Sequence, residues 1–172
     1  MRYKLLILFF IPICLFGKNE IDNECNCSVV LYYKQIKVPL FDDKGKVLCC
    51  VMNDTTTEDY FGVIIMKINK NNRLAYVSAS ATLYDTIPKI GWIETKNLGI
   101  YPSKFSTINL YYNPNIDSKI KSKIFKPEYF PFNILDCKEN WLYISYLDTD
   151  GKIKEGWLSP EDQCSNPYST CN

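Results

Sequence analysis

Short runs of β-branched and aromatic residues alternate with polar turn residues from about residue 29 onward. In the first part of the chain, these runs predict strands over 38–41, 46–52, 60–68, 73–81 and 90–95. In the second part, they predict strands over 108–112, 119–125, 129–136, 141–147 and 156–158. No stretch after the N-terminal apolar segment keeps an apolar period of 3.6 residues, so we expect an all-β protein with little helix.

Turn residues separate the predicted strands. Asp42-Asp43-Lys44-Gly45 and Asp148-Thr149-Asp150-Gly151 are hairpin signals, because glycine and aspartate tolerate tight-turn backbone geometry. Asn113-Pro114-Asn115 is a further turn, since proline cannot continue a central strand.

The pattern occurs twice. Gly91-Trp92-Ile93-Glu94 recurs as Gly156-Trp157-Leu158-Ser159. Two further segments correspond in the same order, 74–77 with 141–144 and 38–41 with 108–111. A repeat of this length indicates a duplicated small unit. One unit of ~60 residues is only marginally stable alone, so we expect the two, packed together or joined by disulfides, to support each other.

The second unit resembles the SH3-like domains that occur in tandem in small secreted bacterial proteins. The resemblance rests on 110–115, 118–120, 140–144, Gly151-Lys152 and 156–158. The first unit departs from the pattern, with Leu74 where the second has Trp141, and with a longer loop after Ser80. The resemblance implies one small, partly open barrel per unit, and binding or targeting rather than catalysis.

The N-terminus predicts export. A basic start, Met1 to Lys4, precedes the apolar stretch 5–16 and the small residue Gly17, which is the order of a secretory signal peptide. A retained anchor helix would need a longer apolar stretch, and a lipid on Cys14 is a further alternative. We therefore expect a periplasmic or extracellular protein that contacts the membrane only through its signal peptide.

This organisation gives four segments. They are a signal peptide over 1–17, a cysteine-containing arm over 18–33, a divergent first SH3-like domain over 34–103, and a second over 104–172.

Charge and composition exclude several functions. Cleavage after Gly17 removes Arg2 and Lys4 and leaves 18 basic against 19 acidic residues, a net charge of −1. Such a chain is a poor partner for nucleic acid. The chain has no histidine, which excludes serine–histidine and cysteine–histidine catalysis and most zinc sites. Its paired acids lie in predicted turns rather than facing one another, so we expect no enzyme.

Seven cysteines remain in the exported chain, a density that predicts disulfides. Cys164 and Cys171 close a short proline-containing loop and form the clearest candidate pair. The Cys25/Cys27 and Cys49/Cys50 groups predict a disulfide from the arm to the first unit, with a copper(I) or zinc thiolate site as the alternative. Cys137 is the candidate unpaired thiol.

Aromatic residues supply the candidate ligand-binding positions. Trp92 and Trp157, at equivalent positions, are expected to be structural. Adjacent aromatic residues in one strand face opposite sides, so some of them are exposed. Exposed rings bind peptides or sugars at low entropic cost. The candidates are Tyr111, Tyr112, Tyr129 and Phe130.

The resulting hypothesis is a non-catalytic envelope module without cofactor or bound metal. It would recognise peptidoglycan or an envelope protein or peptide. The alternatives are an interaction or inhibitor protein for one specific protein partner, and a metal-handling protein that uses the N-terminal cysteines.

Overall fold

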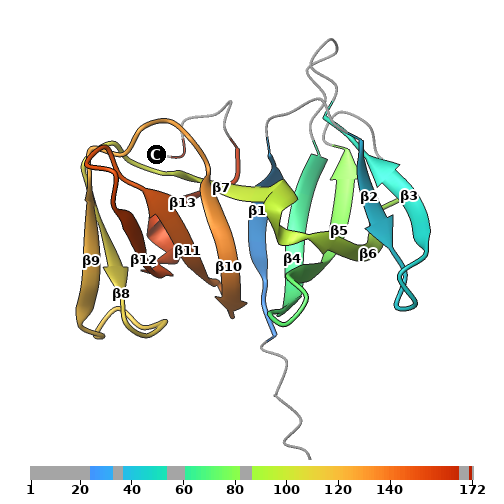
Figure 1. The fold of residues 1–172 in the computed structure, drawn as a ribbon, viewed down its shortest axis with the longest axis horizontal. Coiled ribbons are helices and arrows are strands. Elements are labelled where there is room, and N and C mark those ends of the chain that lie inside the picture. The colour runs from blue at the N-terminus through green and yellow to red at the C-terminus, as the bar shows by residue number, and fades with distance from the viewer. Residues whose placement is uncertain (1–23, 33–36, 54–60, 82–86, 167–170, 172) are drawn as a thin grey trace, which may run out of the picture.

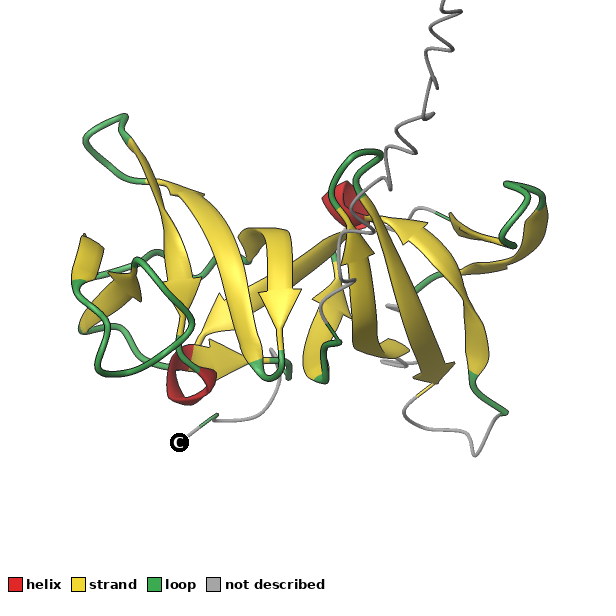
Figure 2. Ribbon diagram, turned by 90° about the horizontal axis from the view of Figure 1, so that it is seen from below, coloured by secondary structure: helices red, strands yellow, loops and turns green. Residues whose placement is uncertain are grey.

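A computed structural model describes residues 24–32, 37–53, 61–81, 87–166 and 171 of the 172-residue chain. These residues form thirteen β-strands and two short 3-10 turns, so the all-β prediction is confirmed (Figures 1 and 2). The described part contains no helix long and apolar enough to cross a membrane. The proposed signal peptide and Cys14 lie outside the described residues.

Two halves of the sheet have the same strand order. The first half contains β2 (Val38–Phe41), β3 (Val47–Val51), β4 (Phe61–Asn69), β5 (Leu74–Ala81) and β6 (Lys89–Glu94). The second half contains β8 (Thr107–Tyr111), β9 (Ile120–Phe125), β10 (Phe132–Lys138), β11 (Trp141–Leu147) and β12 (Ile153–Leu158). Their orders are β3-β2-β6-β5-β4 and β9-β8-β12-β11-β10. The sequence repeat is therefore also a repeat of strand pairing.

Three strands outside the repeat join the halves. β1 (Cys27–Leu31) pairs with β4 and with β7 (Leu98–Pro102), and β7 also pairs with β10 and with β13 (Gln163–Cys164). β1 and β7 therefore lie between the halves (Figure 1). The 3-10 turns η1 (Thr95–Asn97) and η2 (Pro160–Asp162) follow the last strand of each half (Figure 2). The single sheet does not close, because β3 and β9 end it without pairing to each other.

One hydrophobic core serves both halves. It includes buried side chains from the first half, such as Leu40 and Ile65, together with Ile108 and Ile144 from the second. Strand β11 shows how the sequence builds it, since Leu142, Ile144 and Tyr146 are buried while the residues between them are not. Each half thus relies on the other to bury its apolar face.

Close packing explains the repeated glycine-tryptophan motif. A Cβ atom at Gly91 would lie 2.9 Å from the backbone oxygen of Phe41. At Gly156 it would lie 2.8 Å from the Cβ of Leu110 and 3.1 Å from the backbone oxygen of Tyr111. Both positions need a residue without a side chain so that β6 can lie against β2, and β12 against β8.

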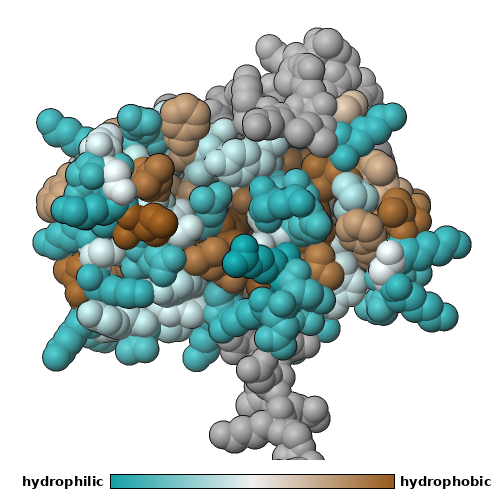
Figure 3. Space-filling view, in the orientation of Figure 1, coloured by the Kyte–Doolittle hydropathy of each residue, from teal (hydrophilic) through white to brown (hydrophobic). Residues whose placement is uncertain are grey.

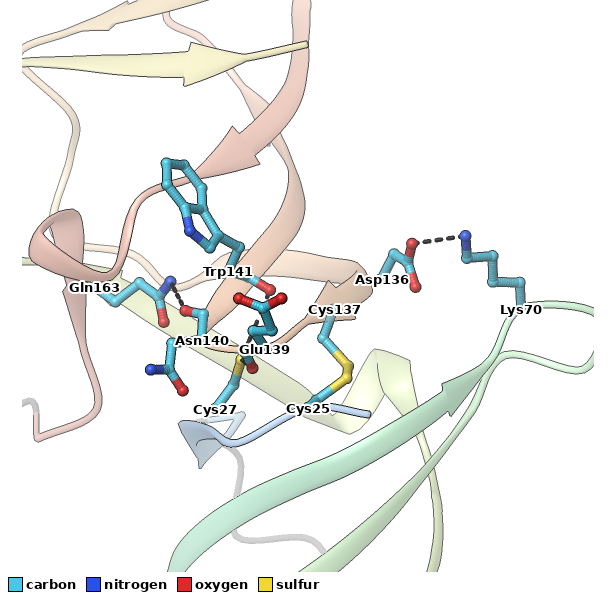
Figure 4. Close-up of a disulfide and its surroundings, with 9 residues drawn as sticks. All are labelled: Cys25, Cys27, Lys70, Asp136, Cys137, Glu139, Asn140, Trp141 and Gln163. Carbon is cyan, nitrogen blue, oxygen red and sulfur yellow. Dashed lines mark hydrogen bonds and ion pairs between the residues drawn. A yellow bond between two sulfur atoms is a disulfide. The ribbon is translucent and has the colours of Figure 1, made fainter. Parts of the chain in front are cut away.

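The disulfides differ in part from expectation. Cys164 and Cys171 are bonded, as their spacing predicted. Cys137 is not the unpaired thiol, because it is bonded to Cys25 across 112 residues (Figure 4). The disulfide therefore ties the arm to the second half, while strand β1 of the arm pairs with β4 of the first. Two disulfides fit an oxidising compartment.

Candidate functional site

An open groove runs from the first half to the second. Within the described residues, three hollows of this groove have volumes of about 510, 440 and 410 Å³. The first and second share Asn72 and Glu94, and the second and third share Arg73, Thr95 and Leu135. Residues from both halves therefore line one continuous surface. Figure 3 shows polar side chains gathered over the middle of the molecule, between apolar patches of the two halves.

Each half has an equivalent aromatic pair, and the tryptophan of each pair lines the groove. Tyr76 lies opposite Trp92 in the β5–β6 ladder, with ring centres 5.1 Å apart. Tyr143 lies opposite Trp157 in the β11–β12 ladder, with ring centres 5.4 Å apart. Trp92 lines the first hollow and Trp157 the third. Each tryptophan therefore packs on a tyrosine of its own half. Each also lines the groove.

The acidic end of the groove lies in the first half and contains Asp42, Asp43 and Glu94. Asp42 Oδ1 accepts hydrogen bonds from the backbone N–H groups of Lys44 and Lys46, at 2.9 and 2.8 Å. Asp43 Oδ1 accepts one from Trp92 Nε1 at 2.8 Å. The β2–β3 turn thus fixes its carboxylates and orients the indole.

An ion pair joins the halves at the other end of the groove. Lys70, just after β4, lies with its Nζ 2.6 Å from Oδ2 of Asp136 in β10 (Figure 4). The Asp136 side chain is only 9% exposed and that of Lys70 is 58% exposed. Asp136, Tyr143 and Trp157 line the third hollow with Lys70, and we call this the aromatic end.

Arg73 lies between the two ends. It lines the second and third hollows, and its backbone has a left-handed conformation with φ of +55°. Its carbonyl oxygen accepts a hydrogen bond from the Thr95 N–H at 2.9 Å, which ties the β4–β5 turn to η1. Sequence reasoning had not selected Arg73, Lys70 or Asp136.

The four aromatic candidates do not form one site. Tyr111 is buried and packs edge-on against Trp141, with ring centres 5.7 Å apart. Tyr112 is exposed and follows the end of β8. Tyr129 packs on Tyr101 and on Phe105, which precedes β8, so it lies at the opposite end of that strand.

Phe130 is 63% exposed and Phe105 58% exposed. We call Phe105, Tyr129 and Phe130 the aromatic patch. None of the three lines the groove.

The cysteines considered as metal ligands are dispersed. Cys25 is in a disulfide, and Cys49 and Cys50 are on the edge strand β3, which four other strands separate from β1 in the sheet. Cys27 is buried, and its Sγ contacts the backbone oxygen of Glu139 at 3.3 Å. Burial raises the pKa of this thiol to about 12. In the described part of the chain, no three His, Cys, Asp or Glu side chains group as metal ligands would.

No family model, curated protein or solved structure matches this chain. The functional assignment therefore rests on the geometry of the groove.

Proposed function

We propose that the protein is a non-catalytic binding module of the bacterial envelope, built from two tandem SH3-like units. It recognises cell-wall material or an envelope peptide in the groove. The observation that carries this proposal is the continuity of the groove over both halves, with an equivalent tryptophan from each repeat in its lining.

The composition of the groove suits recognition of an extended ligand. Indole and phenol rings offer large apolar surfaces that lose little side-chain entropy on binding. The acidic end and Arg73 supply polar groups that fix orientation. The repeated order of five strands, left open at its ends, supports two partly open SH3-like units. The two disulfides support export into an oxidising compartment.

The aromatic patch favours a second candidate function, an interaction or inhibitor protein for one protein partner. Exposed, adjacent aromatic side chains are enriched in protein interfaces. Tyr129 is held between Tyr101 and Phe105, which leaves Phe130 projecting beside it.

Co-sedimentation of the oxidised chain from residue 18 onward with purified peptidoglycan sacculi tests the proposal. We expect saturable pelleting that falls at least fivefold in Trp157→Ala and Leu135→Ser, two groove variants. Phe130→Ala, which changes the aromatic patch, should pellet like the parent. Absence of pelleting by the parent protein contradicts wall binding. If only Phe130→Ala loses pelleting, the aromatic patch and not the groove is the binding surface.

A further inference from the structure

We infer that Arg73 binds the free carboxylate of a short dipolar peptide, whose amino group faces the acidic end of the groove. This inference rests on the proposed function and names the ligand class of the same site. Its basis is the position of Arg73 between two ion pairs that are already formed.

The neighbouring carboxylates of Arg73 already have lysine partners. Asp136 is paired with Lys70 at 2.6 Å, and Glu94 with Lys96 at 2.5 Å. Within the described residues, the guanidinium of Arg73 has neither an ion pair nor a hydrogen bond, although the residue lines two of the three hollows. Among the described residues, none neutralises the positive charge at the centre of the groove.

The chemistry of arginine determines the ligand group. A guanidinium has five donors in a planar fork, which matches the two oxygens of a carboxylate. Leu135, Tyr143 and Trp157 form apolar walls beside it. Arg73 itself is exposed, so these walls offer apolar contact to a bound ligand rather than shielding from water. They also accommodate an apolar side chain next to the carboxylate.

The backbone limits the freedom of this arginine. A left-handed conformation is uncommon for a residue other than glycine, asparagine or aspartate. The preceding Asn71 and Asn72 are of a residue type that adopts the left-handed conformation more readily, yet Arg73 is the residue of this turn that has it. The hydrogen bond from Thr95 holds the turn in place, so the base of the side chain is fixed. Fixing the base reduces the entropy lost when a ligand binds.

The acidic end sets the direction of the ligand. Asp42, Asp43 and Glu94 line the hollow next to Arg73, and a long polyanion lying along the groove would meet them. A peptide with one free carboxylate and one free amino group avoids this repulsion when its amino group faces that end. The peptide part of cell-wall material carries both groups.

Lys70 has a positioning role in this arrangement. It neutralises Asp136, which otherwise lies beside Arg73 in the third hollow as a competing carboxylate. Replacing Lys70 by glutamine should therefore weaken carboxylate binding, although Lys70 need not contact the ligand.

Isothermal titration calorimetry with soluble, peptide-bearing wall fragments tests the inference. The probes are the native fragments, the same fragments with carboxyl groups converted to amides, and the same fragments with amino groups acetylated. We expect the parent protein to bind native fragments at least tenfold more tightly than amidated ones, and also more tightly than acetylated ones. Arg73→Gln should lose this preference for native over amidated fragments, whereas Arg73→Lys should keep part of it.

Lys123→Gln, an exposed lysine of β9 outside the groove, is the control for loss of one positive charge. Circular dichroism of each variant verifies folding. Equal binding of native and amidated fragments by the parent protein overturns the inference and leaves the proposed function standing. Equal binding of acetylated fragments overturns the placement of the amino group. No binding of any fragment overturns the proposed function together with the inference.

Discussion

Lys67 and Asp136 occupy equivalent positions in the two halves, each opposite a tyrosine of the neighbouring strand, but they carry opposite charges and contact different partners. Lys67 lies opposite Tyr76 in the β4–β5 ladder, and Asp136 lies opposite Tyr143 in the β10–β11 ladder, each directly after a bulge. The Nζ of Lys67 lies 5.2 Å from the ring centre of Trp92. Asp136 instead pairs with Lys70 from the first half.

This difference changes the charge beside the aromatic pair of each half. In the first half, a lysine of the same unit lies over the aromatic pair, where a cation–π contact stabilises it. In the second half, the residue at the equivalent position is Asp136, which forms an ion pair with Lys70 of the first half. The aromatic pair of the second half has a different lysine of its own unit, since Lys121 Nζ lies 5.0 Å from the ring centre of Tyr143. Divergence of the repeat at this position places the ion pair between the halves at the aromatic end of the groove.

The ion pair between Lys70 and Asp136 should contribute measurably to stability. Asp136→Asn should lower the free energy of unfolding by about 1–2 kcal/mol, because the carboxylate is nearly buried and its partner is half exposed. Lys96→Gln, which breaks the more exposed pair with Glu94, should cost less than about 0.5 kcal/mol. Urea unfolding of the two variants compares them, and equal losses would contradict this ranking.

The glycines before the tryptophans should not tolerate a methyl group. Gly156→Ala should destabilise the protein by about 1–3 kcal/mol, because the new Cβ meets the Cβ of Leu110 and the backbone of β8. Gly91→Ala should behave similarly.

Gly151→Ala is the matched control. Nothing lies within 4 Å of its added Cβ, so only the cost of its positive φ of +75° remains, about 1 kcal/mol. Thermal unfolding measures all three variants. A larger loss at Gly151 than at Gly156 would show that backbone conformation, and not packing, explains the motif.

The Cys25–Cys137 disulfide should stabilise the fold more than the Cys164–Cys171 disulfide. In the chain-entropy model, closing a loop with a separation of 112 residues stabilises by roughly 5 kcal/mol, against roughly 2.5 kcal/mol for a separation of 7. Chemical unfolding of the two double serine variants measures both losses. The reverse order would mean that native-state contacts, rather than loop closure, determine the effect.

The Cys27 thiol should make the free energy of unfolding depend on pH in the alkaline range. Its pKa is about 12 in the folded protein against an ordinary value of 9.0, because burial disfavours the thiolate. Above pH 9 the unfolded chain releases the proton while the folded protein retains it. The contribution of this thiol to stability is therefore complete below pH 9 and falls as the pH rises towards 12.

Urea unfolding of the parent and of Cys27→Ala at pH 8, 9 and 10 measures this effect. As the pH rises, the free energy of unfolding of the parent should fall relative to that of Cys27→Ala. A constant difference between the two free energies would contradict the raised pKa of the Cys27 thiol. At pH 8, iodoacetamide should modify exposed Cys50 long before Cys27.

The strands of the repeat could be predicted from local pattern. The alternation in 141–147 matches β11 residue for residue, because one face of that strand packs on the core. The predicted strand 129–136 begins later, at Phe132, since the segment before it turns at Glu128 to Phe130 instead of pairing. The strands β1, β7 and β13 were missed, because each is short and each gains its partners from distant parts of the chain.

The site was less predictable than the fold. The repeat drew attention to Trp92 and Trp157, which line the groove, but it assigned them only a structural role. Arg73 and Lys70 lie in a polar turn whose sequence resembles any solvated hairpin. Their importance comes from the packing of that turn against β10, and the pairing of Cys25 with Cys137 comes from the same contact between halves.

The three tryptophan side chains can report directly whether a ligand occupies the groove. Each gives one indole N–H signal in a nitrogen–proton correlation spectrum, and the native wall fragments would be titrated into labelled protein. We expect the signals of Trp92 and Trp157 to shift together with one saturation curve, while Trp141, which packs on Tyr111 outside the groove lining, shifts less. Shifts confined to backbone signals of the aromatic patch, with Trp92 and Trp157 unmoved, would contradict this expectation.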